Sequence, residues 1–158
     1  MKLTEYQAGG FRLLNKIGEG GLRSYPAAAV TIAKGSALVD DTNGYATNTA
    51  TDLSAIFLGI AAEPCVNAAG ASGDLDVLVI PPLPQYQFSV PVDGNAVLTR
   101  SSVGVVVDIG ADANHVAIND TVTGNWGFFI DDIDISAAAL AVHPYGYAIG
   151  HFQMMSTT

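Results

Sequence analysis

Short hydrophobic runs separated by turn-forming residues characterise the chain from Ala29 onward. The runs are rich in Val, Ile, Phe, Tyr and Thr, and clusters of Gly, Asn, Asp and Pro divide them. Because β-branched and aromatic residues favour strands, this pattern predicts a mainly β fold. The expected strands are Val30–Ala33, Ala37–Val39, Tyr45–Thr47, Ala55–Ala61, Leu75–Ile80, Gln85–Val92, Ala96–Thr99, Val103–Ile109, His115–Ile118, Trp126–Ile130 and Tyr145–Phe152.

Turn-forming residues mark where these strands end. Asn43-Gly44 and Asp93-Gly94 are the strongest hairpin signals, because glycine reaches positive φ freely and Asn or Asp tolerates it. Four prolines between residues 81 and 91 indicate strand ends or edges, since proline has no amide hydrogen to give to a ladder. The expected fold class is a small β-barrel or β-sandwich.

Helix-forming patterns are short. Ile135–Val142 combines high helix propensity with a cap at Asp134 or Ser136 and a stop before Pro144, which predicts at most about two turns. A second helical turn is expected near Asp52–Ala55. At most one or two short helices should therefore accompany the strands.

Residues 1–28 follow a different pattern, in which five glycines interrupt scattered leucines and isoleucine. This pattern fits neither a long helix nor a regular strand. One interpretation is an extended N-terminal arm that becomes ordered on a partner. The other is an ordinary N-terminal strand packed on its own domain. We expect an arm over residues 1–28 and a single β-rich domain over residues 29–158.

Composition points to a surface that a partner covers. Only 13% of the 158 residues are charged, against about 25% in average proteins. The net charge is −9, yet five of the six basic residues lie within residues 1–34. This asymmetry indicates a mildly basic segment that docks on an acidic surface. The acidic body excludes a nucleic-acid groove, because it repels phosphates.

Cysteine content and hydrophobic run lengths exclude two further classes. Cys65 is the single cysteine, so no intramolecular disulfide forms. The first residues lack an apolar run, and we expect no secretory signal. No hydrophobic run approaches the roughly 18 residues that a membrane-spanning helix needs. We therefore expect no membrane partner.

Candidate catalytic residues are few. Carboxylates gathered on one loop bind hard cations, and the densest acidic segment is Asp-Asp-Ile-Asp at residues 131–134. Asp also caps turns on its own, so a solvated turn is the competing interpretation. A metal-assisted hydrolase is a rival hypothesis, and its ligands are Asp131, Asp132 and Asp134.

Other catalytic patterns do not occur. His115, His143 and His151 lie at no metal-ligand spacing. The chain has neither a nucleophile elbow nor a phosphate-binding loop. We therefore expect no enzyme activity, no metal and no cofactor.

Three stretches of the body resemble small tailed-bacteriophage capsid decoration proteins, also called cement proteins. They read VTIAKGSALVDDTNGYAT from Val30, AIFLGIAAEPCVNAAGASGDLDVLVI from Ala55 and GYAIGHF from Gly146. The opening hairpin, the LGIA strand, the Gly-Asp turn and the VLVI strand look like that family's β-barrel or β-tulip core. The resemblance extends from about Val30 to Phe152.

This resemblance implies a structural virion protein on the capsid exterior, which stabilises contacts between major capsid protein subunits. In that family, homotrimers sit on three-fold points of the shell, and an N-terminal arm reaches onto the major capsid protein. The implied partners are therefore the major capsid protein and further copies of this chain. The implied arm contacts are Tyr6, Phe11, Arg12, Leu13, Leu14 and Ile17.

Trp126 supports an alternative. It lies between Asn125 and Gly127, where an exposed indole can stack on a sugar. The alternative function is a carbohydrate-binding or adhesin-like β-sandwich module of a virion or cell-surface appendage. The competing interpretation of Trp126 is a core anchor at the start of a strand.

Overall fold

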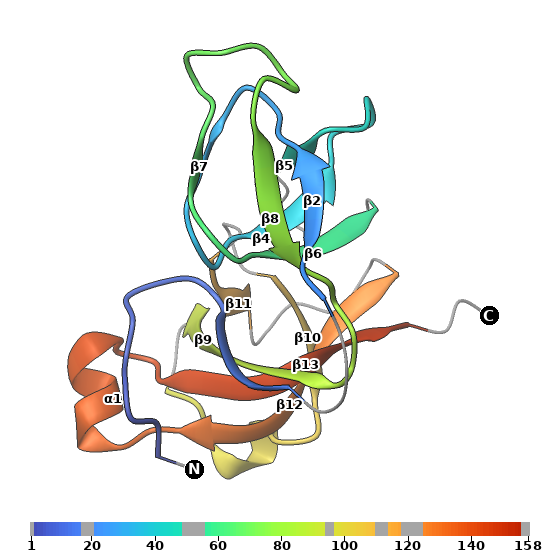
Figure 1. Cartoon of the computed structure of the whole chain (residues 1–158). Coiled ribbons are helices and arrows are strands. Elements are labelled where there is room, and N and C mark those ends of the chain that lie inside the picture. Colours follow the sequence, from blue (N-terminus) through green and yellow to red (C-terminus); the bar gives the residue numbers. More distant parts are fainter. Residues whose placement is uncertain are drawn as a thin grey trace.

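The computed structural model describes residues 2–16, 21–48, 56–93, 97–109, 114–117 and 125–155. Their strands form two lobes, one above the other in Figure 1. The small lobe contains β2 (Arg23–Pro26), β3 (Thr31–Ile32), β4 (Ala37–Asp40), β5 (Ala46–Thr47), β6 (Phe57–Ala61), β7 (Cys65–Val66) and β8 (Asp76–Ile80). The large lobe contains β1 (Arg12–Lys16), β9 (Tyr86–Asp93), η1 (Arg100–Ser102), β10 (Val106–Ile109), β11 (Val116–Ala117), β12 (Trp126–Asp134), α1 (Ala137–Val142) and β13 (Tyr147–Met154). The predicted mainly β fold with at most two short helices is confirmed.

Strands of the large lobe close into a ring. β9 pairs with β13, β13 with β12, β12 with β10, β10 with β11, and β11 returns to β9. The β11–β9 pairing is parallel, and the other four are antiparallel. β1 adds to β9 beyond the end of β11, because β1 pairs with residues 86–89 and β11 with residues 92–93. Closure leaves few unpaired backbone groups at sheet edges.

The small lobe is an antiparallel sheet in the order β2-β8-β6-β4-β5, with the β3–β7 pair beside it. The predicted Asn43-Gly44 turn connects β4 to β5, and Gly44 has a φ of 90°. Gly59 in β6 has a φ of 130°, and a Cβ there would lie 2.0 Å from the Ile80 carbonyl oxygen. Only glycine permits this close approach of β6 to β8.

One hydrophobic core joins the two lobes. Phe152 of β13 lies at its centre, with its ring centroid 5.1 Å from that of Phe11, 5.6 Å from Phe88 and 5.2 Å from Phe128. From the small lobe, the Phe57 ring approaches Phe152 to 4.8 Å. Aromatic rings in such tilted contacts stabilise a core beyond their burial. The lobes are therefore held together by the same side chains.

The predicted helix over Ile135–Val142 corresponds to α1, and Ser136 is its N-cap because its Oγ accepts a hydrogen bond from the Ala139 amide. The expected helical turn near Asp52–Ala55 lies outside the described residues. The predicted strand at Ala96–Thr99 is wrong for its described part. Leu98 is buried in a loop, where its amide donates to the Tyr145 carbonyl instead of to a neighbouring strand.

Residues 2–16 are packed on the large lobe. Figure 1 shows this N-terminal segment passing α1 before it enters β1. Leu3 and Phe11 are 6% and 4% exposed, and β1 pairs with β9. β2 in turn pairs with β8, so residues 23–26 belong to the small lobe. For these residues the structure favours the packed-strand interpretation over the extended arm, because Leu3 and Phe11 are buried within the chain and β1 and β2 pair with β9 and β8.

Candidate partner-binding cleft

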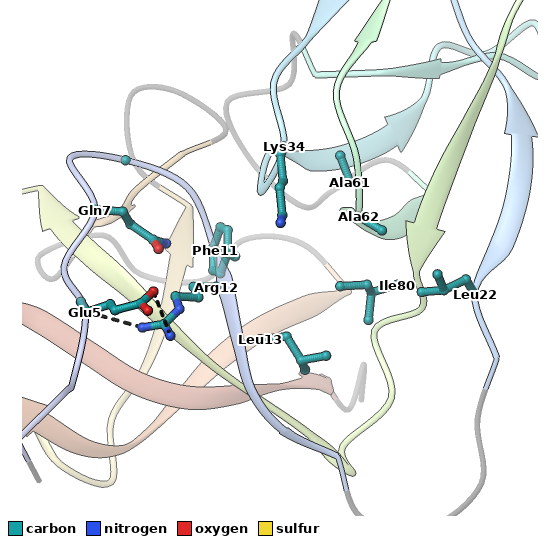
Figure 2. Close-up of a pocket in the computed structure, with 11 residues that line it drawn as sticks. Glu5, Gln7, Phe11, Arg12, Leu13, Leu22, Lys34, Ala61, Ala62 and Ile80 are labelled. Atoms are coloured by element: carbon teal, nitrogen blue, oxygen red, sulfur yellow. Dashed lines mark hydrogen bonds and ion pairs between the residues drawn. The ribbon is translucent and has the colours of Figure 1, made fainter.

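A cleft of about 590 Å³ lies between the N-terminal segment and the small lobe (Figure 2). Pockets that bind ligands typically enclose roughly 300–1,000 Å³. The lining residues are Glu5, Gln7, Gly9, Phe11, Arg12, Leu13, Leu22, Lys34, Ala61, Ala62 and Ile80. Each lobe therefore contributes one side of the cleft.

A close backbone contact holds the two sides in place. The Phe11 amide donates to the Gly35 carbonyl at 2.8 Å, and the Gly35 amide donates to the Ala61 carbonyl at 2.8 Å. Gly35 has a φ of 87°, and a Cβ there would lie 2.9 Å from the Phe11 carbonyl oxygen. Glycine is required because no other residue fits both the positive φ and the short distance. This contact positions Lys34 at the cleft.

Polar side chains line the side formed by the N-terminal segment. The Arg12 guanidinium pairs with the Glu5 carboxylate at 3.1 Å and also donates to the Glu5 carbonyl. Gln7 donates to the Gly10 carbonyl at 2.6 Å, which stabilises the turn before Phe11. The Glu5 side chain is 75% exposed, so water weakens this ion pair.

Exposed apolar side chains occur on both sides. Leu22 on the small-lobe side is 51% exposed, and Leu13 on the side of the N-terminal segment is 37% exposed. Figure 2 places Ile80 next to Leu22. Lys34 points into the gap from the small lobe (Figure 2), and no described carboxylate forms an ion pair with it. The cleft thus combines exposed leucines with an uncompensated positive charge.

The structure places the residues expected to contact a capsid in different parts of the molecule. Arg12 and Leu13 line the cleft, and Phe11 reaches its edge while belonging to the core. Tyr6 and Leu14 pack instead against a separate hydrophobic cluster. Ile17 lies outside the described residues. The expected contact role of Phe11 is wrong for this conformation, because a ring with 4% exposure has no surface to offer.

Tyr6 belongs to a site that we name the Asp134 socket, formed by Leu3, Tyr6, Asp134, Ser136 and Tyr147. Asp134 is 2% exposed. Its carboxylate accepts hydrogen bonds from the Leu3 amide at 2.6 Å, the Tyr6 hydroxyl at 2.7 Å and the Ser136 amide at 2.9 Å. Burial alone would raise the pKa of Asp134, but these hydrogen bonds hold it below the ordinary value.

The hydroxyl of Tyr147 also holds the N-terminal segment, because it donates to the Gln7 carbonyl. The Tyr147 ring lies 5.3 Å from that of Tyr6. Burial raises the pKa of the Tyr147 phenol. The socket therefore fastens residues 3–7 to β12 and β13.

The three carboxylates of the 131–134 segment bind three different partners. Asp131 pairs with His151 at 2.9 Å, Asp132 pairs with Arg100 at 2.6 Å, and Asp134 lies in its socket. Among the described residues, no group of three or more His, Cys, Asp or Glu side chains is placed to hold a metal ion. Each of these carboxylates is engaged by a different partner, so the structure lends the metal-assisted hydrolase no support.

Trp126 and the histidines have structural partners. Trp126 is half-buried, and its ring meets Phe57 edge-on at 5.8 Å. The structure therefore favours its interpretation as a core anchor over that of a sugar platform. The His115 and His143 rings lie 5.4 Å apart, and the His143 Nε2 atom lies 2.6 Å from the Val92 carbonyl oxygen.

Sequence reasoning missed most of the cleft lining, including Leu22, Lys34 and Ile80. Lys34 carried one usable signal, because it belongs to the basic N-terminal third of an acidic chain. Leu22 and Ile80 carried none, since only the pairing of β2 with β8 brings them to the same side of the cleft.

Comparison with family models, curated proteins and solved structures found no match to the chain. No helix in the described part of the chain is long and apolar enough to cross a bilayer.

Proposed function

We propose that this chain is a structural virion protein that binds the outside of a tailed-bacteriophage capsid and stabilises contacts between major capsid protein subunits. The proposal names the major capsid protein and other copies of this chain, as a homotrimer, as partners. It places the protein on the exterior of the virion.

The observation that carries the proposal is an exposed apolar surface on a chain with few charges. Large hydrophobic side chains are exposed on both lobes, and among them are Leu22, Ile56, Val66, Leu75, Val97, Val142 and Met154. Val66 and Met154 are each 69% exposed. Such a surface is suited to being covered by protein neighbours, because interface cores are poor in charge and rich in apolar groups.

Two further features support the same proposal. The described strands of the large lobe close into a ring. A closed ring suits a protein that must resist deformation while it is attached to a capsid. The sequence resemblance to decoration proteins extends over both lobes. The carboxylates considered for catalysis, Asp131, Asp132 and Asp134, are engaged in hydrogen bonds and ion pairs.

Co-sedimentation tests the proposal directly. Purified protein is mixed with capsids of its own source from which the decoration layer is absent, and the pellet is analysed after centrifugation through a cushion. We expect saturable binding at a fixed ratio to the major capsid protein, and capsids that withstand higher temperature once loaded. Protein that stays in the supernatant at micromolar concentration would remove the proposal.

Light scattering tests the proposed assembly. A homotrimer of 16.3 kDa chains should scatter with about three times the mass of one chain. A stable monomer at all concentrations would contradict the trimer and leave capsid binding to be judged by sedimentation.

A further inference from the structure

We propose that the cleft receives an extended, acidic segment of the partner protein, with a carboxylate beside Lys34 and apolar side chains against Leu13 and Leu22. The inference rests on the proposed function, because it specifies the kind of segment that the capsid contributes. Three properties of the cleft lead to this occupant.

The first property is charge. Lys34 and Arg12 are two of only six basic residues in a chain of net charge −9, and both line the cleft. Among the described lining residues Glu5 is the single acid, and it is already paired with Arg12. The cleft is therefore a positive indentation in an acidic protein, and complementary charge attracts and orients a carboxylate there.

The second property is that the cleft already holds a carboxylate. Glu5 reaches Arg12 from the N-terminal segment at 3.1 Å, but its side chain is 75% exposed. Exposed ion pairs contribute at most about 1 kcal/mol. A partner carboxylate can therefore share Arg12 with Glu5 or displace it without a large cost, while Lys34 has no described carboxylate to give up.

The third property is that both sides of the cleft combine a cation with an exposed leucine. Arg12 and Leu13 lie on the side of the N-terminal segment, whereas Lys34 and Leu22 lie on the small-lobe side (Figure 2). Successive side chains of an extended peptide point to opposite sides. Such a peptide can present carboxylates to the cations and apolar groups to the leucines. A small anion would neutralise Lys34 but leave Leu13 and Leu22 in water, and a nucleic acid would be repelled by the acidic body.

The test uses the full chain and the capsids described above, with binding measured as a function of protein concentration. Lys34→Glu and Leu22→Asp should each weaken binding by about tenfold, because each places a negative charge against the acidic segment. Lys34→Arg should bind like the unchanged protein. Glu5→Gln should bind about two- to threefold more tightly, since it frees Arg12.

Two matched controls separate the cleft from general effects of charge. Lys2→Glu changes the net charge as Lys34→Glu does, and Ala69→Asp places an acid at an exposed apolar position as Leu22→Asp does, but neither residue lines the cleft or belongs to the exposed hydrophobic surface proposed to bind the capsid. Both controls should bind within about twofold of the unchanged protein. Losses in the controls as large as those in the cleft variants would overturn the inference.

Photo-cross-linking identifies the occupant. A benzophenone amino acid replaces Leu22, loaded capsids are irradiated, and the product is digested and sequenced by mass spectrometry. We expect a cross-link to an Asp- or Glu-containing segment of the major capsid protein. A cross-link only to a second copy of this chain, or none from protein that sediments with the capsid, would overturn the inference while the proposed function stands. Failure of the unchanged protein to sediment would instead remove the proposed function, and the inference with it.

Discussion

The two ends of the N-terminal segment differ in chemistry, although about five residues separate them. At its first end, Leu3 and Tyr6 enter the Asp134 socket, where a buried carboxylate receives three hydrogen bonds. At its second end, Arg12 and Leu13 face an open cleft that keeps exposed leucines and a positive charge without an ion pair. Satisfied and buried groups stabilise a fold, whereas exposed groups without partners remain free to bind. We therefore expect the socket to stabilise the fold and the cleft to bind a partner.

The largest effect on the free energy of unfolding should come from removing the carboxylate of the Asp134 socket. Asp134→Ala should lower the free energy of unfolding by about 2–4 kcal/mol, because the Leu3 amide and the Tyr6 hydroxyl lose their buried acceptor. Urea denaturation measures this change. Asp131→Ala is the matched control on the same strand, and its half-exposed pair with His151 should contribute at most about 1 kcal/mol. Equal losses in the two variants would contradict a special role for the socket.

A smaller effect should follow removal of a single socket hydroxyl. Tyr147→Phe should cost about 1–2 kcal/mol, since the partly buried Gln7 carbonyl loses its donor. In hydrogen exchange, the amides of residues 3–7 should exchange faster in this variant, while those of β12 should not change. Tyr25→Phe is the control, because the Tyr25 hydroxyl makes no hydrogen bond to a described residue. An unchanged exchange rate at residues 3–7 would show that Tyr147 does not hold the segment.

The socket should also make stability depend on pH at both extremes. The pKa of Asp134 is lowered in the folded chain, so its contribution is complete above the unfolded value of 3.8 and is lost as pH falls through the folded value. The pKa of Tyr147 is raised, so its contribution is complete below 10.0 and is lost as pH rises through the folded value. Unfolding curves across pH check both directions. Asp134→Asn should flatten the acid limb and also reduce the alkaline limb, because the Asp134 charge contributes to the raised pKa of Tyr147. A profile identical to that of the unchanged protein would refute the assignment.

The smallest effect on stability should come from the cleft. Lys34→Glu and Leu22→Asp should each change the free energy of unfolding by less than about 0.5 kcal/mol, because both residues are exposed and Lys34 forms no ion pair with a described residue. Thermal denaturation measures this directly. A loss above about 1 kcal/mol in either variant would mean that the cleft contributes to the fold as well, and would end the division between the two regions.

Local patterns were sufficient to predict the elements that depend on neighbours in sequence. Short hydrophobic runs bounded by turn residues indicated β6, β8, β9 and β13, and Ser136 with the following alanines indicated α1. The pattern left β1 and β2 undecided between an arm and a packed strand, because their glycine-rich surroundings obscure it and pairing with β9 and β8 decides their conformation. Tertiary contacts override weak local preference in such segments.

The cleft and the socket depend on residues far apart in sequence. Leu3 and Asp134 are 131 positions apart, yet they share one hydrogen bond. Of the described residues expected to meet a partner, only Arg12 and Leu13 stand exposed or half-exposed at the cleft. Hydrophobicity alone cannot separate Phe11, which completes the core, from Leu13, which borders the cleft, since tertiary packing decides which of the two side chains is covered.

The ring of strands in the large lobe dictates an order of events during synthesis. The ring cannot close until β13 has been synthesised, because residues 147–154 pair with both β9 and β12. The sheet of the small lobe needs nothing beyond residue 80, so it can form while the ribosome is still translating the second half of the chain. During that interval the aromatic residues of β9 have no counterpart from β13 to cover them. A growing chain in which the small lobe has formed therefore still exposes apolar residues of the incomplete large lobe. Covering these residues until β13 is synthesised favours folding over association.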